Sequence, residues 1–238
     1  MKSTIVLKSF LFFLSLTTVN AFAENYIGIS TTSGDYNRET GLQLGFEGNN
    51  YGSNIKLTNT AGDMVIEGQP AFIKLKQDNN SEFRVGADFD TTTATRSQGV
   101  FAEYNHYRNS GINFSVKGVV GEGVVNTQED RLTAYGAPGI NSELYSAMNA
   151  VELAVGQNFG NNNITLSTTK KNFNVLANGG GEVETNSVKA EWSTLFGRKK
   201  DLEVTASYEA ERTSGKGNGL EQGSLDVSRV GVSVVKYF

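Results

Sequence analysis

The residues that could carry out catalysis in this chain are few. The sequence contains one histidine, His106, and no cysteine. Nucleophilic hydrolysis usually requires a histidine beside a serine or beside an acid that orients it. The segment around the histidine reads Asn105-His-Tyr-Arg-Asn-Ser110 and lies next to a predicted short turn. We therefore expect His106 to be a surface or interfacial residue and the protein not to be an enzyme.

Two further kinds of segment have the composition of binding loops but not their spacing. The glycine-rich stretches 118–123, 179–181 and 215–219 do not join a strand to a helix, which is the setting in which such loops bind phosphate. The acidic and amide clusters at 88–90 and 128–130 lack the spacing of a calcium loop. The net charge is −4, without a basic patch for nucleic acid. We expect no metal, no cofactor and no nucleic acid.

Most of the ionisable residues instead alternate with apolar residues. In the segment 82–90, Phe83 and Val85 alternate with Glu82 and Arg84. A period of two residues is that of a β-strand with one apolar face. The same alternation of apolar and polar residues predicts twelve strands. They lie at 25–32, 40–48, 51–60, 70–77, 82–90, 98–107, 111–120, 147–159, 163–170, 185–196, 201–211 and 226–238. Ten or fourteen strands are the alternatives, because segment 64–66 could extend a strand.

The predicted connections alternate in length. The long ones lie near 33–39, 61–69, 91–97, 121–146, 171–184 and 212–225, and the short ones are 49–50, 78–81, 108–110, 160–162 and 197–200. Strict alternation of this kind is typical of a transmembrane barrel in which both chain ends lie on the side of the short turns.

The last strand carries the most specific pattern. Valines and the final aromatic residue share one of its faces: Val230, Val232, Val234 and Phe238. This ending resembles the closing strand of Gram-negative outer-membrane β-barrel proteins, and the resemblance implies that the barrel-assembly machinery reads the terminal aromatic residue. Leu225 and Val227 have the opposite parity. They predict either a β-bulge near Ser228 or a position in the preceding loop.

The first residues have the form of a secretory signal. Lys2 and Lys8 precede a short apolar run that starts at Phe10, and Ala21-Phe-Ala23 has the form of a signal-peptidase site. We expect cleavage after Ala23, which leaves 24–238 as one domain. An exported chain without cysteine has no disulfides to stabilise it.

Beyond this signal, no segment is apolar enough for a transmembrane helix, so the chain can span a membrane only as a closed barrel. We predict an all-β, antiparallel, up-and-down transmembrane β-barrel, integral to the bacterial outer membrane, with both termini periplasmic. The expected partners are outer-membrane lipids, lipopolysaccharide and the barrel-assembly machinery, and the expected state is a monomer.

If the apolar face contacts lipid, the charged residues face the lumen. The predicted inward cations are Lys56, Lys74, Lys76, Arg84, Lys117, Lys189 and Arg229. The predicted inward acids are Glu47, Glu82, Asp88, Glu103, Glu152, Glu191, Glu203, Glu209 and Glu211. Buried charges of both signs must pair or stay hydrated.

Two functions fit such a lumen. One is a porin-like passive channel for small hydrophilic solutes, in which opposed charges set a transverse field and the 121–146 loop could fold inward as a constriction. The alternative is a structural or interaction barrel whose lumen is closed by its own salt bridges and whose outer loops bind a partner, a surface or a phage.

Two narrower resemblances count against more specific functions. The size and strand number resemble those of small monomeric channels for acidic sugars, but that resemblance implies a strongly basic lumen, and this one is slightly acidic. We do not expect an anionic oligosaccharide. The sequence around His106 resembles a His-x-Ser-Asn stretch of a lipid A deacylase, yet Arg108 stands where the resemblance implies the nucleophilic serine.

Overall fold

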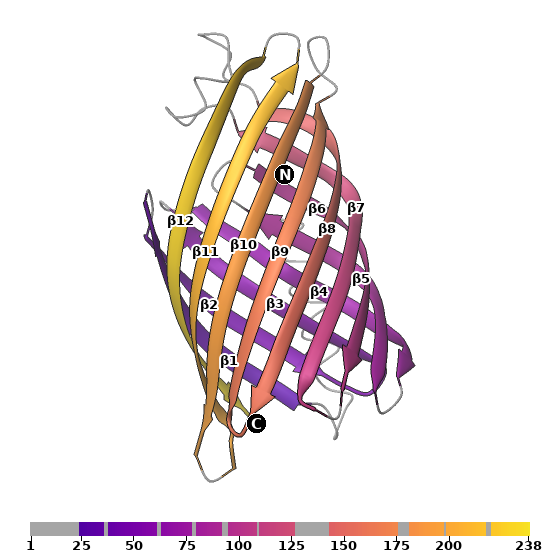
Figure 1. Ribbon diagram of the computed structural model, residues 1–238, viewed down its shortest axis with the longest axis vertical. Helices are drawn as coiled ribbons and strands as arrows, with labels where there is room; N and C mark the ends of the chain where they lie inside the picture. Colours follow the sequence, from indigo (N-terminus) through magenta and orange to yellow (C-terminus); the bar gives the residue numbers. More distant parts are fainter. Residues whose placement is uncertain are drawn as a thin grey trace.

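The structure, a computed structural model, describes residues 24–35, 38–60, 63–77, 80–91, 95–108, 110–126, 143–175, 181–197, 199–217 and 220–238. The predicted signal peptide, residues 1–23, lies outside them. The described residues form twelve antiparallel strands that close into one barrel, in which β1 pairs with β12 (Figure 1). The predicted fold class and strand number are confirmed. No helix in the described part of the chain is long and apolar enough to cross a membrane.

The strands follow one another around the barrel wall. Their bounds are β1 Glu24–Gly34, β2 Arg38–Glu47, β3 Tyr51–Thr60, β4 Asp63–Gln77, β5 Ser81–Thr91, β6 Thr95–Tyr107, β7 Ile112–Asn126, β8 Glu143–Phe159, β9 Asn162–Val175, β10 Gly181–Phe196, β11 Leu202–Gly217 and β12 Leu220–Tyr237. β1 begins and β12 ends at the same end of the barrel, where Tyr26 pairs with Tyr237. Short turns join the strands at this end, which we call the turn end (Figure 1). We call the opposite end the loop end.

The turns use glycine where the backbone requires a positive φ. Gly111, Gly160 and Gly197, each in a different turn, have φ angles of 81°, 65° and 87°. Glycine accepts these angles because it has no Cβ to clash with the backbone. The turn sequences therefore let consecutive strands reverse within a few residues and pair along their whole length.

The outward face of the wall is apolar. On β8, Val151, Leu153 and Val155 expose 51%, 49% and 50% of their surface, while Glu152 between them borders the internal cavity. Exposed aliphatic side chains of this size recur on most strands. Such a surface is unfavourable in water and favourable against lipid hydrocarbon. The barrel thus has its apolar side chains outside and its polar side chains inside, the opposite of a water-soluble protein.

Most strands extend further toward the loop end than predicted. β7 runs to Asn126 and β8 starts at Glu143, so both ends of the predicted 121–146 loop are strand, and residues 127–142 lie outside the described part. β4 starts at Asp63 and includes 64–66, and the predicted loop 212–225 is almost entirely strand in β11 and β12. On β11 and β12 the outward residues of this region, among them Arg212, Ser224 and Asp226, are polar, so the apolar alternation used to find the strands is absent there.

The last strand has no bulge near Ser228. Its pairing with β11 is continuous from Lys236 to Gly223, and the one register shift lies between Gly215 and Gly217. Both sequence alternatives for Leu225 and Val227 are therefore wrong. The two side chains belong to the strand, share its inward face with Arg229, and are buried at 6% and 5% exposure.

Candidate functional site

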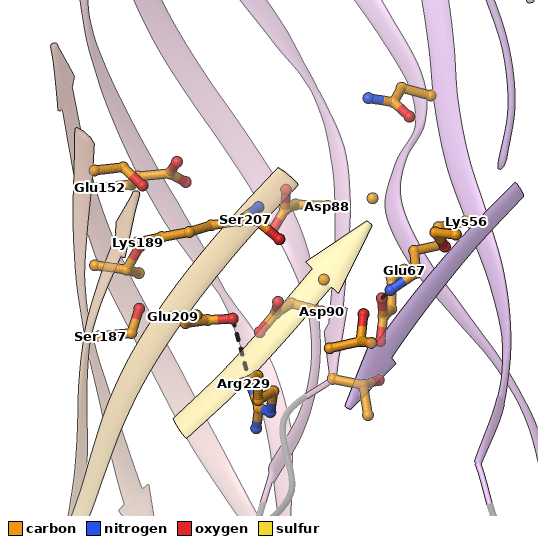
Figure 2. A pocket seen from close by; sticks show the side chains of 18 of the residues that line it. Lys56, Glu67, Asp88, Asp90, Glu152, Ser187, Lys189, Ser207, Glu209 and Arg229 are labelled. Carbon is orange, nitrogen blue, oxygen red and sulfur yellow. Dashed lines mark hydrogen bonds and ion pairs between the residues drawn. The ribbon is translucent and has the colours of Figure 1, made fainter. Parts of the chain in front are cut away.

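The barrel encloses a cavity of about 1040 Å³, and all twelve strands contribute to its lining. The residues around it are mainly charged residues, serines and threonines, such as Ser187 and Ser207 on neighbouring strands (Figure 2). Among the described residues, no group of three or more histidine, cysteine or acidic side chains could hold a metal ion. The lumen is therefore a polar space whose chemistry comes from fixed charges and hydroxyl groups.

A compact network of charges lies at the turn end. The Lys74 ammonium is 2.7 Å from Glu47 and 3.0 Å from Glu82. The Arg84 guanidinium is 2.8 Å from Glu47, donates a hydrogen bond to Glu82, and lies over the ring of Phe72, 4.9 Å from its centroid. The side chains of Lys74 and Glu82 are each only 6% exposed. This network stabilises the wall formed by β2, β4 and β5, and of its four charged residues only Glu47 borders the main cavity.

A second network lies further along the same wall. The Lys117 ammonium of β7 is 3.1 Å from Asp88 of β5 and 3.2 Å from Glu152 of β8. Lys171 of β9 donates a hydrogen bond to Asp90 of β5, although three strands separate β5 from β9 in the barrel. This ion pair therefore crosses part of the lumen and narrows it.

The opposite wall carries its own charges. The Arg229 guanidinium of β12 is 3.4 Å from Glu209 and 3.1 Å from Glu211, both on β11 (Figure 2). On β10, the Lys189 ammonium is 2.7 Å from Glu191 of the same strand. In Figure 2, Lys189 lies on the left of the cavity and Lys56 on the right, with Arg229 between them, and Lys56 of β3 is 3.3 Å from Glu67 of β4. Cations and carboxylates therefore alternate around the cavity.

The predicted inward residues fall into three groups. Those that line the cavity are Lys56, Lys117, Lys189, Arg229, Glu47, Asp88, Glu152, Glu191, Glu203, Glu209 and Glu211. Those placed inside the wall but outside the cavity lining are Lys74, Arg84, Glu82 and Glu103, the last paired in the ladders with Arg84 and Lys117. The side chain of Lys76 lies outside the described part, just after a shift in the pairing of β4 with β5.

Four charged residues of the lumen were missed from the sequence: Glu39, Glu67, Asp90 and Lys171. All four lie at or beyond the predicted strand ends on the loop side, where the apolar alternation stops. Lys171 still continues the inward parity of Ser167 and Thr169, which was the signal that could have found it.

An apolar layer covers the inward face near the loop end of β7 to β10. It belongs to a buried cluster formed by Phe72, Phe101, Val119, Val125, Met148, Ala150, Phe173 and Val183. The ring of Phe173, which is 0% exposed, lies on Gly123, where an added Cβ would come within 2.6 Å of a ring carbon. Beside this layer the hydroxyl groups of Thr185 and Thr213 hydrogen-bond at 3.0 Å. The lumen is therefore packed along one side of its loop end.

The remaining sequence candidates lie on the outer wall or at the turn end. His106 packs between aromatic neighbours, with its ring centroid 6.4 Å from that of Tyr104 and 5.2 Å from that of Phe114. Phe238 is 74% exposed, and its N–H donates to the carbonyl of Asn25 at 2.9 Å. Val230 and Val232 are exposed on the outer wall, as their parity predicts.

One turn residue has a shifted pKa. Asp201, in the turn between β10 and β11, has a pKa below its usual range because the Lys236 ammonium donates a hydrogen bond to its carboxylate. This contact holds the end of β12 to the neighbouring turn.

Neither a protein-family model nor a curated protein sequence matches the chain. Solved structures share its fold, among them two porins. The NanC porin has a TM-score of 0.51 at 14% identity, with 88% of this chain and 98% of that chain covered. The KdgM porin has a TM-score of 0.54 at 9% identity, with 90% of this chain and 99% of that chain covered. The chain therefore has the barrel fold of outer-membrane porins, as the resemblance of its last strand implied.

Proposed function

We propose that the protein is a passive channel for small hydrophilic solutes in the bacterial outer membrane. The observation that carries this proposal is the polar cavity of about 1040 Å³, which all twelve strands line with charged and hydroxyl side chains. A barrel built only for stability could fill this volume with packed apolar side chains, as small barrels do. Fixed charges around a hydrated space instead allow a polar solute to exchange its hydration for wall contacts.

The proposed location follows from the outer surface. The apolar wall fits a bilayer, and the short turns with both strand ends fit the periplasmic side of an outer-membrane barrel. Outer-membrane lipids and lipopolysaccharide would contact the wall, and the barrel-assembly machinery would recognise the last strand. The proposed state is a monomer: one chain closes the barrel, so the lumen needs no residue from a second copy.

A closed structural barrel is the competing function, and specific contacts favour it. The turn-end network around Lys74, the ion pair between Lys171 and Asp90, and the packed layer around Phe173 all reduce the open cross-section. In this case the lumen charges would serve stability, and the outer loops would bind a partner, a surface or a phage.

Planar-bilayer recording separates the two functions. The mature protein, refolded and verified by a heat-dependent shift in gel mobility, is expected to give discrete conductance steps. Lys171→Ala removes the side chain that reaches across the lumen from β9 to β5, and should raise the single-channel conductance. Lys170→Ala is the matched control, because Lys170 is 54% exposed and pairs with Glu184 at 2.7 Å rather than across the lumen. A folded barrel without conductance would establish the closed barrel instead.

A further inference from the structure

We infer that the lumen favours cations over anions, so that the solutes it passes are small hydrophilic molecules that are neutral or carry an amine or guanidinium group. This inference rests on the proposed channel function and adds the class of solute. It follows from how the lumen charges are paired, which the sequence did not reveal.

Every inward-facing cation among the described side chains is neutralised by at least one carboxylate. Four of them each contact two carboxylates. Lys74 and Arg84 share Glu47 and Glu82, which leaves that cluster balanced, whereas each of the other two cations has two carboxylates to itself. Arg229 lies 3.4 Å from Glu209 and 3.1 Å from Glu211. Lys117 is held in the same way by Asp88 and Glu152. Each of these clusters keeps a surplus negative charge, and the two lie on different walls of the cavity.

Three more inward carboxylates lie within ion-pair distance of none of the described cations. Glu39 and Glu203 line the cavity itself, and Glu203 accepts a hydrogen bond from the hydroxyl group of Tyr237. Glu103 lies between Arg84 and Lys117 in the strand ladders, while those cations form their ion pairs with other carboxylates.

Among the described residues, no further inward-facing cation is left to neutralise these surplus carboxylates. Arg96 borders the cavity, but it shares its face of β6 with Val100, which is 68% exposed on the outer wall. The surplus negative charge is therefore spread along the lumen, from Glu203 near the turn end to Glu39 near the loop end of β2.

This charge should act on every ion that enters. At a distance of about 6 Å in a water-like medium, one fixed charge changes the local concentration of a monovalent ion by about threefold. Screening acts over roughly 10 Å at 0.1 M salt and roughly 3 Å at 1 M. The preference for cations should therefore be clear in dilute salt and weak in concentrated salt.

The test is the reversal potential of the refolded mature protein in a bilayer of neutral lipids with a KCl gradient near 0.1 M. We expect K⁺ to be favoured over Cl⁻ by about threefold or more, and the preference to decline near 1 M KCl. Glu39→Gln and Glu203→Gln should each reduce it. Glu122→Gln should not, because Glu122 is exposed and accepts a hydrogen bond from Gln98 on the outer wall.

The outcomes distinguish the two proposals. Conductance with a preference for Cl⁻, or with no preference in dilute salt, would overturn the inference and leave the channel function standing. A K⁺ preference that Glu122→Gln reduces as much as the lumenal variants would overturn the assignment to the lumen. A folded, heat-modifiable barrel without conductance would overturn both.

Discussion

The turn-end network gives the sharpest test of how lumen charges contribute to stability. Lys74→Met keeps much of the side-chain length and removes the ammonium that lies 2.7 Å from Glu47 and 3.0 Å from Glu82. Removing one partner of a buried ion pair costs about 3–5 kcal/mol. Here Glu82 keeps its contact with Arg84, and Glu47 is 41% exposed, so that water can hydrate it. We therefore expect a loss of about 2–3 kcal/mol in the free energy of unfolding.

The assay is urea unfolding of the barrel in lipid vesicles. The single tryptophan, Trp192, lies on the outward face of β10 and is 56% exposed, so its emission should change when the strand leaves the lipid. Lys170→Met is the matched control, because the pair with Glu184 is exposed and should contribute less than about 1 kcal/mol. The reasoning is refuted if the two lysine variants lose the same stability.

A second variant separates an unpaired charge from lost packing. Adding Glu82→Gln to Lys74→Met leaves no uncompensated carboxylate at the most buried position of the network. The double variant should be more stable than Lys74→Met alone, because the amide can remain buried without a counter-charge. If the double variant is less stable by the full sum of the single changes, the loss comes from packing and the charge argument fails.

Three further predictions concern other parts of the barrel. Gly123→Ala should lower the stability by about 1–3 kcal/mol, because its Cβ would meet a ring carbon 2.6 Å away, whereas Gly118→Ala has nothing within 4 Å and should be neutral in the same urea titration. NMR titration should give a pKa for Asp201 below the usual carboxylate value, and Lys236→Met should raise it. Because the folded pKa is the lower one, the contact stabilises the barrel above the unfolded pKa and is lost as the pH falls through the folded value. Deletion of Phe238 should reduce surface levels in cells more than the stability of the refolded barrel, and normal surface levels would contradict the assembly role.

The candidate site shows where sequence reasoning stops being sufficient. Alternation gives the face of a side chain, and many of the charged residues singled out in this way border the internal cavity. It does not fix the partner of a side chain. Lys171 and Asp90 are 81 residues apart, and their contact exists only because β5 and β9 approach each other across the lumen. The sequence placed Lys74 and Arg84 on the same inward face as Lys189. In the structure their side chains pair with carboxylates of the turn-end network, and only Lys189 borders the cavity.

The sequence by itself determined the twelve strands, their apolar outer face and the closing strand that precedes Phe238. These properties are local, because the period of two and the turn glycines act within a few residues. Only the tertiary structure decided which charges share a counter-ion, that Leu225 and Val227 point inward, and how much of the lumen stays open. Those properties depend on strand register and on distances across the barrel, which bring together residues that no local pattern connects.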